Sequence, residues 1–89
     1  MDDKEKYLSL INEVVQKQSV ILGPEIALLK ARNIKALTIT PDGKVTDISG
    51  DAHAALQQLV DEYVKLAGQI VKNALSSVFE KYPNIEHVK

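Results

Sequence analysis

The residues best suited to metal chemistry are sparse in this sequence. The chain has two histidines, His53 and His87, and no cysteine. Zinc sites use three or four His, Cys or carboxylate ligands at recurring spacings such as His-Glu-x-x-His, and that spacing is absent here. We therefore expect no metal ion, and we interpret His53 as a surface residue in the first turn of a helix. The lack of cysteine also excludes disulfides and thiolate chemistry.

The three residue types of a hydrolytic triad occur close together, as Ser49, Asp51 and His53. A triad requires a nucleophile, a base and an orienting acid that converge in a cleft, and nearness in sequence does not supply that geometry. Ser49 or Asp51 is better explained as the side-chain cap of a following helix. We predict no catalytic residue here and no enzymatic activity.

The carboxylates suggest no acid–base pair, because such a pair must share an enclosed or apolar site. Asp42 belongs to a turn, Glu25 to the first turn of a helix, and Asp61 and Glu62 to a polar helix face. Asp47 is the exception, because the predicted strand register places it opposite an apolar residue. We interpret Asp47 as lying at the sheet edge, with a ligand contact as the alternative.

The glycines form no phosphate-binding motif, so we expect no cofactor. Gly23, Gly43 and Gly50 lie where elements end. Gly68 instead interrupts a helical pattern, where alanine is better by about 1 kcal/mol. Its presence indicates either a bend in the helix or the close approach of another backbone.

The charge balance argues against several partners. Eleven basic and twelve acidic residues give a formal net charge of −1. Binders of nucleic acid or anionic membranes usually show a basic excess or a basic face, and we expect neither partner. No apolar run approaches the roughly 20 residues that cross a bilayer. The start of the chain, residues 1–6, has mixed charge and no signal-peptide pattern, so we expect a cytoplasmic location.

The elements that must position these residues belong to a single small domain, residues 1–89. Apolar positions three and four apart predict a helix over 4–22, with Gln18 interrupting its apolar face. Gly23 and Pro24 then end that helix and begin another over 24–32. Its composition predicts a largely buried helix, with Asn33 as a left-handed cap.

Residues 34–49 have the pattern of a β-hairpin. Pro41, Asp42 and Gly43 fit a three-residue loop in which Gly43 takes a positive φ. The predicted register pairs Ile39 with Val45, Thr38 with Thr46, and Leu37 with Asp47. A lone hairpin is marginal in water, so it must pack on helices or join strands of a second chain.

From residue 51 the helical pattern continues without a strong breaker to 82, and Pro83 ends it. Its apolar face is wider than that of an ordinary surface helix. The predicted fold class is therefore α+β: two N-terminal helices, one hairpin and one long C-terminal helix (α-α-β-β-α). We expect residues 1–3 and 83–89 to be loosely ordered.

The length of that last helix suggests self-association. Residues 51–81 as one straight helix span roughly 46 Å, whereas a domain of this length has a diameter of only about 30 Å. Either the helix breaks near Gly68 and folds back, or its overhang packs on a second copy. We favour the second, as a homodimer. The candidate interface comprises Ile70, Val71, Ala74, Leu75, Val78 and Phe79.

This pattern favours a non-enzymatic interaction or regulatory module that binds itself or another protein. The alternative is a small-ligand-binding domain with a pocket between the hairpin and the long helix. A ligand-binding domain requires a concavity in which polar groups converge, and an interaction module does not.

Overall fold

The structure, a computed structural model, describes residues 3–80, and it divides the predicted last helix in two. Residues 1–2 and 81–89 lie outside the described part. Of the ends expected to be loosely ordered, residues 1–3 and 83–89, only Asp3 is described, and it begins the first helix. The elements are α1 (Asp3–Leu22), α2 (Pro24–Arg32), β1 (Leu37–Ile39), β2 (Val45–Ile48), α3 (Ala52–Ala67) and α4 (Gln69–Phe79). The α+β class is confirmed. The single long C-terminal helix is wrong, and the order is α-α-β-β-α-α.

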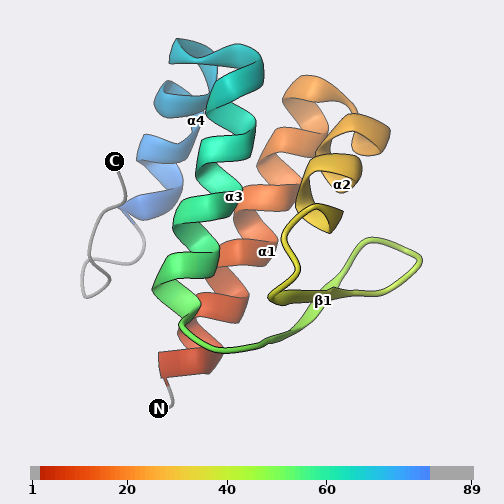
Figure 1. The fold of residues 1–89 in the computed structure, drawn as a ribbon. Coiled ribbons are helices and arrows are strands. Elements are labelled where there is room, and N and C mark those ends of the chain that lie inside the picture. Colours follow the sequence, from red (N-terminus) through yellow and green to blue (C-terminus); the bar gives the residue numbers. More distant parts are fainter. Residues whose placement is uncertain (1–2, 81–89) are drawn as a thin grey trace.

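The helices alternate in direction and form a small bundle (Figure 1). α1 and α3 contact each other and run the same way, while α2 and α4 run back along them. The hairpin lies near the end of the bundle where α1 and α3 begin, which we call the hairpin end. The corners at Gly23 and Gly68 lie at the opposite end, which we call the corner end. No helix of the described part is long and apolar enough to cross a membrane.

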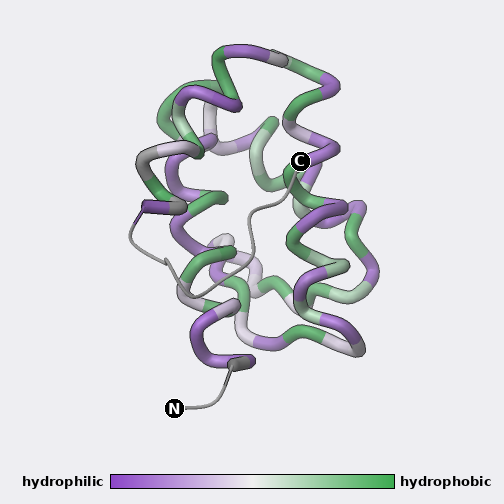
Figure 2. The backbone as a smooth tube through the Cα atoms, turned by 90° about the vertical axis from the view of Figure 1, so that its left-hand side faces the viewer, coloured by the Kyte–Doolittle hydropathy of each residue, from purple (hydrophilic) through white to green (hydrophobic). Residues whose placement is uncertain are grey.

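Apolar side chains from the four helices and both strands form one buried core. Hydrophobic and hydrophilic residues alternate along the helices, so that each helix has one side for this core (Figure 2). Tyr63 of α3 is fully buried, and its hydroxyl donates a 2.8 Å hydrogen bond to the carbonyl oxygen of Ala27 in α2. Burial raises the pKa of this hydroxyl far above its ordinary value, so it stays a neutral donor.

The hairpin turn forms as predicted. The Thr40 N–H donates to the carbonyl oxygen of Lys44, the Gly43 N–H donates to that of Thr40, and Gly43 has a φ of 96°. A positive φ of this size suits glycine, which has no Cβ to clash with the backbone.

The predicted strand register is confirmed at one pair and wrong at two. Ile39 pairs with Val45, but Leu37 pairs with Ile48, and Thr38 pairs with Asp47. Thr46 is an extra residue on β2, which makes a β-bulge. Because of the bulge, Val45 and Ile48 are both buried although they are three residues apart.

The hairpin packs on the helices of its own chain. The Asn12 side chain of α1 donates from Nδ2 to the Val45 carbonyl oxygen, and its Oδ1 accepts from the Val45 N–H, both at 2.9 Å. Leu37, Val45 and Ile48 belong to the common core. The hairpin therefore needs no strands from a second chain for its burial.

The predicted bounds of α2 are confirmed, but its predicted burial is wrong. Only Ala27 and Ala31 of this helix are buried, whereas Ile26 and Leu29 are 43% and 57% exposed. A nine-residue helix at the side of the bundle has one face for the core, and its two alanines occupy it. Asn33, expected as a left-handed cap, is right-handed with a φ of −71°.

Candidate functional site

The triad residue types do not converge on a reaction centre. The Asp51 carboxylate caps α3 and accepts hydrogen bonds from the N–H groups of His53 (2.9 Å) and Ala54 (3.4 Å). The Ser49 N–H donates to the Ala36 carbonyl oxygen at 2.7 Å. Of the two residues predicted as possible caps, Asp51 is the one that caps. These contacts assign structural roles to the backbone of Ser49 and the side chain of Asp51.

His53 is half-buried rather than at the surface as expected. Its ring meets that of Tyr7 edge-on, with centroids 6.3 Å apart. Its Nε2 is buried and has no hydrogen-bond partner among the described residues. Within that part of the chain, no group of three His, Cys, Asp or Glu side chains could hold a metal ion. His87 lies outside the described residues.

Asp47 faces solvent and forms an ion pair with Lys4 of α1. The bulge moves it away from Leu37 and opposite Thr38, which removes the unusual environment that the predicted register implied. The hydrogen bond from Lys4, together with one from the backbone at Ile48, lowers the pKa of this carboxyl. Asp47 therefore joins the N-terminal helix to the hairpin.

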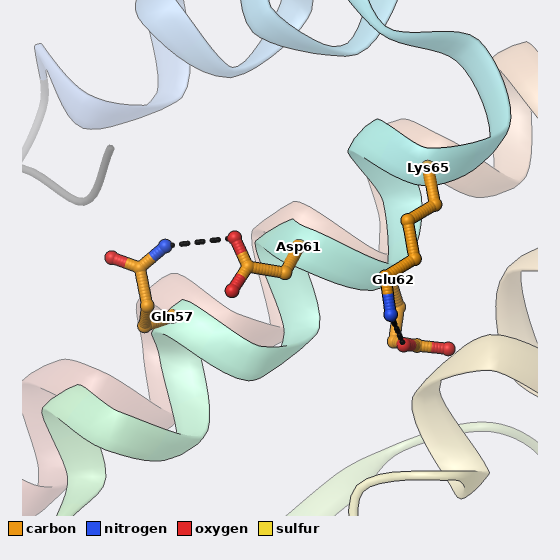
Figure 3. Close-up of polar contacts among 4 residues, drawn as sticks. All are labelled: Gln57, Asp61, Glu62 and Lys65. Carbon is orange, nitrogen blue, oxygen red and sulfur yellow. Dashed lines mark hydrogen bonds and ion pairs between the residues drawn. The ribbon is translucent and has the colours of Figure 1, made fainter.

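The acidic residues on α3 are engaged with neighbours on the same helix (Figure 3). Glu62 pairs with Lys65 at 3.1 Å, and Asp61 accepts a 3.0 Å hydrogen bond from Nε2 of Gln57. The hydrogen bond from Lys65 lowers the pKa of the Glu62 carboxyl. The lowered pKa of Glu62 is opposite to the raised pKa expected of a general acid.

The six residues predicted as a dimer interface separate into different environments. Val71, Leu75 and Val78 are at most 4% exposed and belong to the core of their own chain. Ala74 is half-buried, and Ile70 is 59% exposed. Phe79 ends α4, and its side chain lies outside the described part. The overhang argument for this interface is wrong, because α4 folds back and contacts α1.

A different set of apolar side chains is exposed. Among the described side chains, every large apolar one that is markedly exposed lies within six residues of Gly23 or Gly68. We call this set the corner patch: Val20 (85% exposed), Ile21 (38%), Ile26 (43%), Leu29 (57%), Leu66 (46%) and Ile70 (59%). All four helices contribute to it, and both corners lie at the same end of the bundle (Figure 1).

The polar side chain of Gln18 is buried without a partner. The residue is 0% exposed, and neither its Nε2 nor its Oε1 has a hydrogen bond among the described residues. An unpaired amide of this kind costs about 1–3 kcal/mol. Gln18 lies in the half of α1 nearer the corner end, whereas His53, whose buried Nε2 is also unpaired, lies in the first turn of α3 at the hairpin end.

The described residues also form an open groove of about 790 Å³ between α1, the start of α2 and the hairpin turn. Three carboxylates, from Glu5, Glu13 and Asp42, and one ammonium group, from Lys44, line it together with apolar side chains that include Leu8 and Leu28. The expected pocket was between the hairpin and the last long helix. The groove lies instead between the hairpin turn and α1, because α1 is the helix beside the turn.

Sequence reasoning missed most of the corner patch, although two signals were present. Val20, Ile21 and Leu22 are consecutive, and three consecutive helical side chains cannot all face one core. Ile26 and Leu29 share a face with each other but not with the buried alanines of α2.

Comparison of the chain with models of protein families, with curated proteins and with solved structures finds no match in any of the three.

Proposed function

We propose that this protein is a non-enzymatic interaction module and that two copies pair through the corner patch. One observation carries the proposal: among the described residues, the large exposed apolar side chains all lie within six residues of Gly23 or Gly68. Contiguous apolar surface is limited on soluble monomers, and larger exposed patches mark interaction sites.

A second copy of the chain is the partner that this surface fits best. Two-fold pairing brings the same patch of each copy together, and closed two-fold dimers are the commonest assemblies. Leu29 and Ile70, each more than half exposed, would lose contact with water in such a pair. A domain of 89 residues buries a modest share of its own surface, so added burial stabilises it considerably.

Sedimentation equilibrium over micromolar to millimolar concentrations tests this proposal. We expect the mass to rise from 9.8 kDa toward twice that value. Leu29→Lys and Ile70→Lys should each shift the protein toward monomer. Gln58→Lys adds the same charge at an exposed site of α3 outside the patch and should leave the mass unchanged. A monomer at every concentration, or an equal effect of all three variants, contradicts the proposal.

The groove beside the hairpin turn supports a second candidate function, the binding of a small cation with an apolar part. Its three carboxylates outnumber its one lysine, Lys44, and with the apolar lining they complement such a ligand. NMR titration with benzyltrimethylammonium should then shift signals of α1 and the turn, and Glu5→Gln should weaken binding. Shifts spread over the surface, or unchanged by Glu5→Gln, would argue against this site.

A further inference from the structure

The corner between α3 and α4 consists of one residue. Ala67 ends α3, Gln69 begins α4, and Gly68 between them has φ 50° and ψ −110°. The Gly68 N–H still donates to the carbonyl oxygen of Val64, and its own carbonyl oxygen accepts from the Lys72 N–H. These are helical bonds between residues four apart, so rotation about the two torsions of Gly68 to helical values would join α3 and α4 into one helix.

The sequence around this corner has the pattern of a continuous helix. Val64, Ala67, Val71, Ala74 and Val78 follow one another at alternating spacings of three and four residues, across Gly68. The pattern itself does not specify a corner. A straight helix places these residues on one apolar row. In the folded-back chain the row is divided between α3 and α4, and Val64, Ala67, Val71 and Val78 still pack in the one core.

The straight arrangement is incompatible with a monomer. A continuous helix from Ala52 to Phe79 has 28 residues and is about 42 Å long, whereas the longest extent of the molecule is 31 Å. The α4 segment would leave its site on α1 and expose Val71, Leu75 and Val78. The surface that buries these three side chains is the α4 site. A straight helix cannot reach that site in its own chain, so only another copy of the chain can offer it.

We propose that two copies of this chain pair by exchanging α4, with Gly68 as the hinge. This inference rests on the proposed self-association and specifies how it occurs. Each α4 occupies the site on the partner that the partner's own helix has left. Leu66 and Ile70 flank the hinge and are 46% and 59% exposed in the folded-back chain. Exchange brings the two corner ends together and covers these side chains.

The other corner shows why Gly68 is the hinge. Gly23 also joins two helices through a single residue, with a φ of 93°. It is followed by Pro24, whose ring would clash with the Val20 carbonyl in a continuous helix. Gln69 takes the equivalent place after Gly68 and has no such restriction. Of the two corners, only the one at Gly68 can straighten.

Gly68→Ala tests the hinge in one direction. An added Cβ would find no atom closer than the Val64 carbonyl oxygen at 4.0 Å, so its effect is on the backbone torsions. Alanine favours the straight helix by about fivefold and disfavours the positive φ of the corner by at least about fivefold. With two hinges in a dimer these factors multiply, so we expect dimerisation to strengthen by at least about six-hundredfold.

Two further variants provide the opposite result and the control. Gln69→Pro gives this corner the sequence of the Gly23–Pro24 corner, so it should prevent the straight helix and abolish the exchanged dimer in a folded protein. It also keeps the test decisive if Gly68→Ala fails to fold. Gly23→Ala imposes a similar torsional cost at the corner that cannot straighten, and it should not promote dimers.

A distance measurement identifies the exchange directly. The chain has no cysteine, so spin labels can be placed at Gln58→Cys and Ser76→Cys alone, both exposed sites. Their backbones lie about 27 Å apart in a straight helix and about 10 Å apart, the spacing of packed helices, when α4 is folded back. Labelled protein diluted into unlabelled protein reports distances within one chain, and we expect the longer distance in the dimer.

The outcomes separate the two proposals. A dimer with the short distance, or equal dimerisation of the wild type, Gly68→Ala and Gln69→Pro, overturns the exchange and leaves self-association in place. A monomer for the wild type and for both hinge variants at every concentration overturns both. A long distance in the dimer that Gln69→Pro removes establishes the exchange.

Discussion

The two ends of the helical bundle are held together in different ways. At the hairpin end, polar side chains fix the arrangement: Asn12 bonds to both backbone groups of Val45, Arg32 donates to the Thr40 carbonyl oxygen at 3.1 Å, and Lys4 pairs with Asp47. Directional contacts of this kind fit one geometry. These contacts hold the hairpin against α1 and α2 in one arrangement.

The corner end combines backbone torsions and apolar packing with a buried directional contact, the hydrogen bond from the Tyr63 hydroxyl to the Ala27 carbonyl oxygen. Gly23 and Gly68 each supply a positive φ, and the N–H at each corner bonds to a carbonyl oxygen of the preceding helix. Apolar contacts are not directional, and the corner patch around the glycines stays exposed. The hairpin end is therefore held mainly by polar contacts, whereas the corner end leaves apolar side chains exposed beside its two glycines.

The largest expected effect is a difference in the free energy of unfolding between variants at a buried and at an exposed residue of α4. Leu75→Ala should lower the free energy of unfolding by about 2–5 kcal/mol, because it leaves a cavity in the core. Ile70→Ala, in the same helix but mostly exposed, should change it by less than about 0.5 kcal/mol at concentrations where the protein is monomeric. Urea denaturation measures both. Similar losses for the two variants would contradict the assignment of α4 to the core of its own chain.

The next effect compares one glycine from each end. Gly43 and Gly23 have nearly the same φ, 96° and 93°, so substitution with alanine should cost about 1–2 kcal/mol of torsional strain at either site. A Cβ at Gly43 would also lie 2.9 Å from Leu28, whereas one at Gly23 meets no atom within 4 Å. We therefore expect the larger loss of stability for Gly43→Ala. In a Leu28→Ala background, Gly43→Ala should no longer cost more stability than Gly23→Ala. If the difference persists in that background, it arises from the backbone torsion and not from contact with Leu28.

The smallest effect concerns the ion pair at the hairpin end. Lys4 holds the pKa of Asp47 below its ordinary value in the folded protein. The carboxylate therefore stabilises the fold at neutral pH, and this contribution is lost as the pH falls through its ordinary pKa to the folded one. Asp47→Asn should make the urea midpoint less dependent on pH in that acid range. Asp61→Asn, whose carboxylate accepts from an uncharged amide, is the control; an equal change in the control would argue against a role for the ion pair.

Much of the local structure could be predicted from residues with a specific conformational effect. Pro24 and Gly23 located the first corner, and Asp42 and Gly43 located the turn, because these residues restrict or permit particular backbone torsions. The register failed at Thr46. A strict alternation cannot bury both Val45 and Ile48, and their spacing of three is the sign of the bulge that the sequence already contained.

The candidate site was harder to predict, because hydrophobic periodicity reports which residues share a face and not what covers that face. Val71 and Leu75 have the same spacing whether α4 covers its own chain or a second one. Gly68 was recognised as an interruption, but the choice between the two arrangements depends on tertiary packing. The exposure of Ile26 and Leu29 had the same origin: α2 is apolar on both sides, and its position in the bundle determined which side was buried.

The Asn12 amide has a further consequence for the β2 edge of the hairpin. It presents a donor and an acceptor as a peptide group does, and it occupies the N–H and the carbonyl oxygen of Val45 that point away from β1. These are the groups that an additional strand would use. Unprotected strand edges lead to aggregation by strand addition, and natural proteins cover or interrupt them. Here a single side chain from α1 covers that stretch of the β2 edge and leaves its N–H and carbonyl groups unavailable to a further strand.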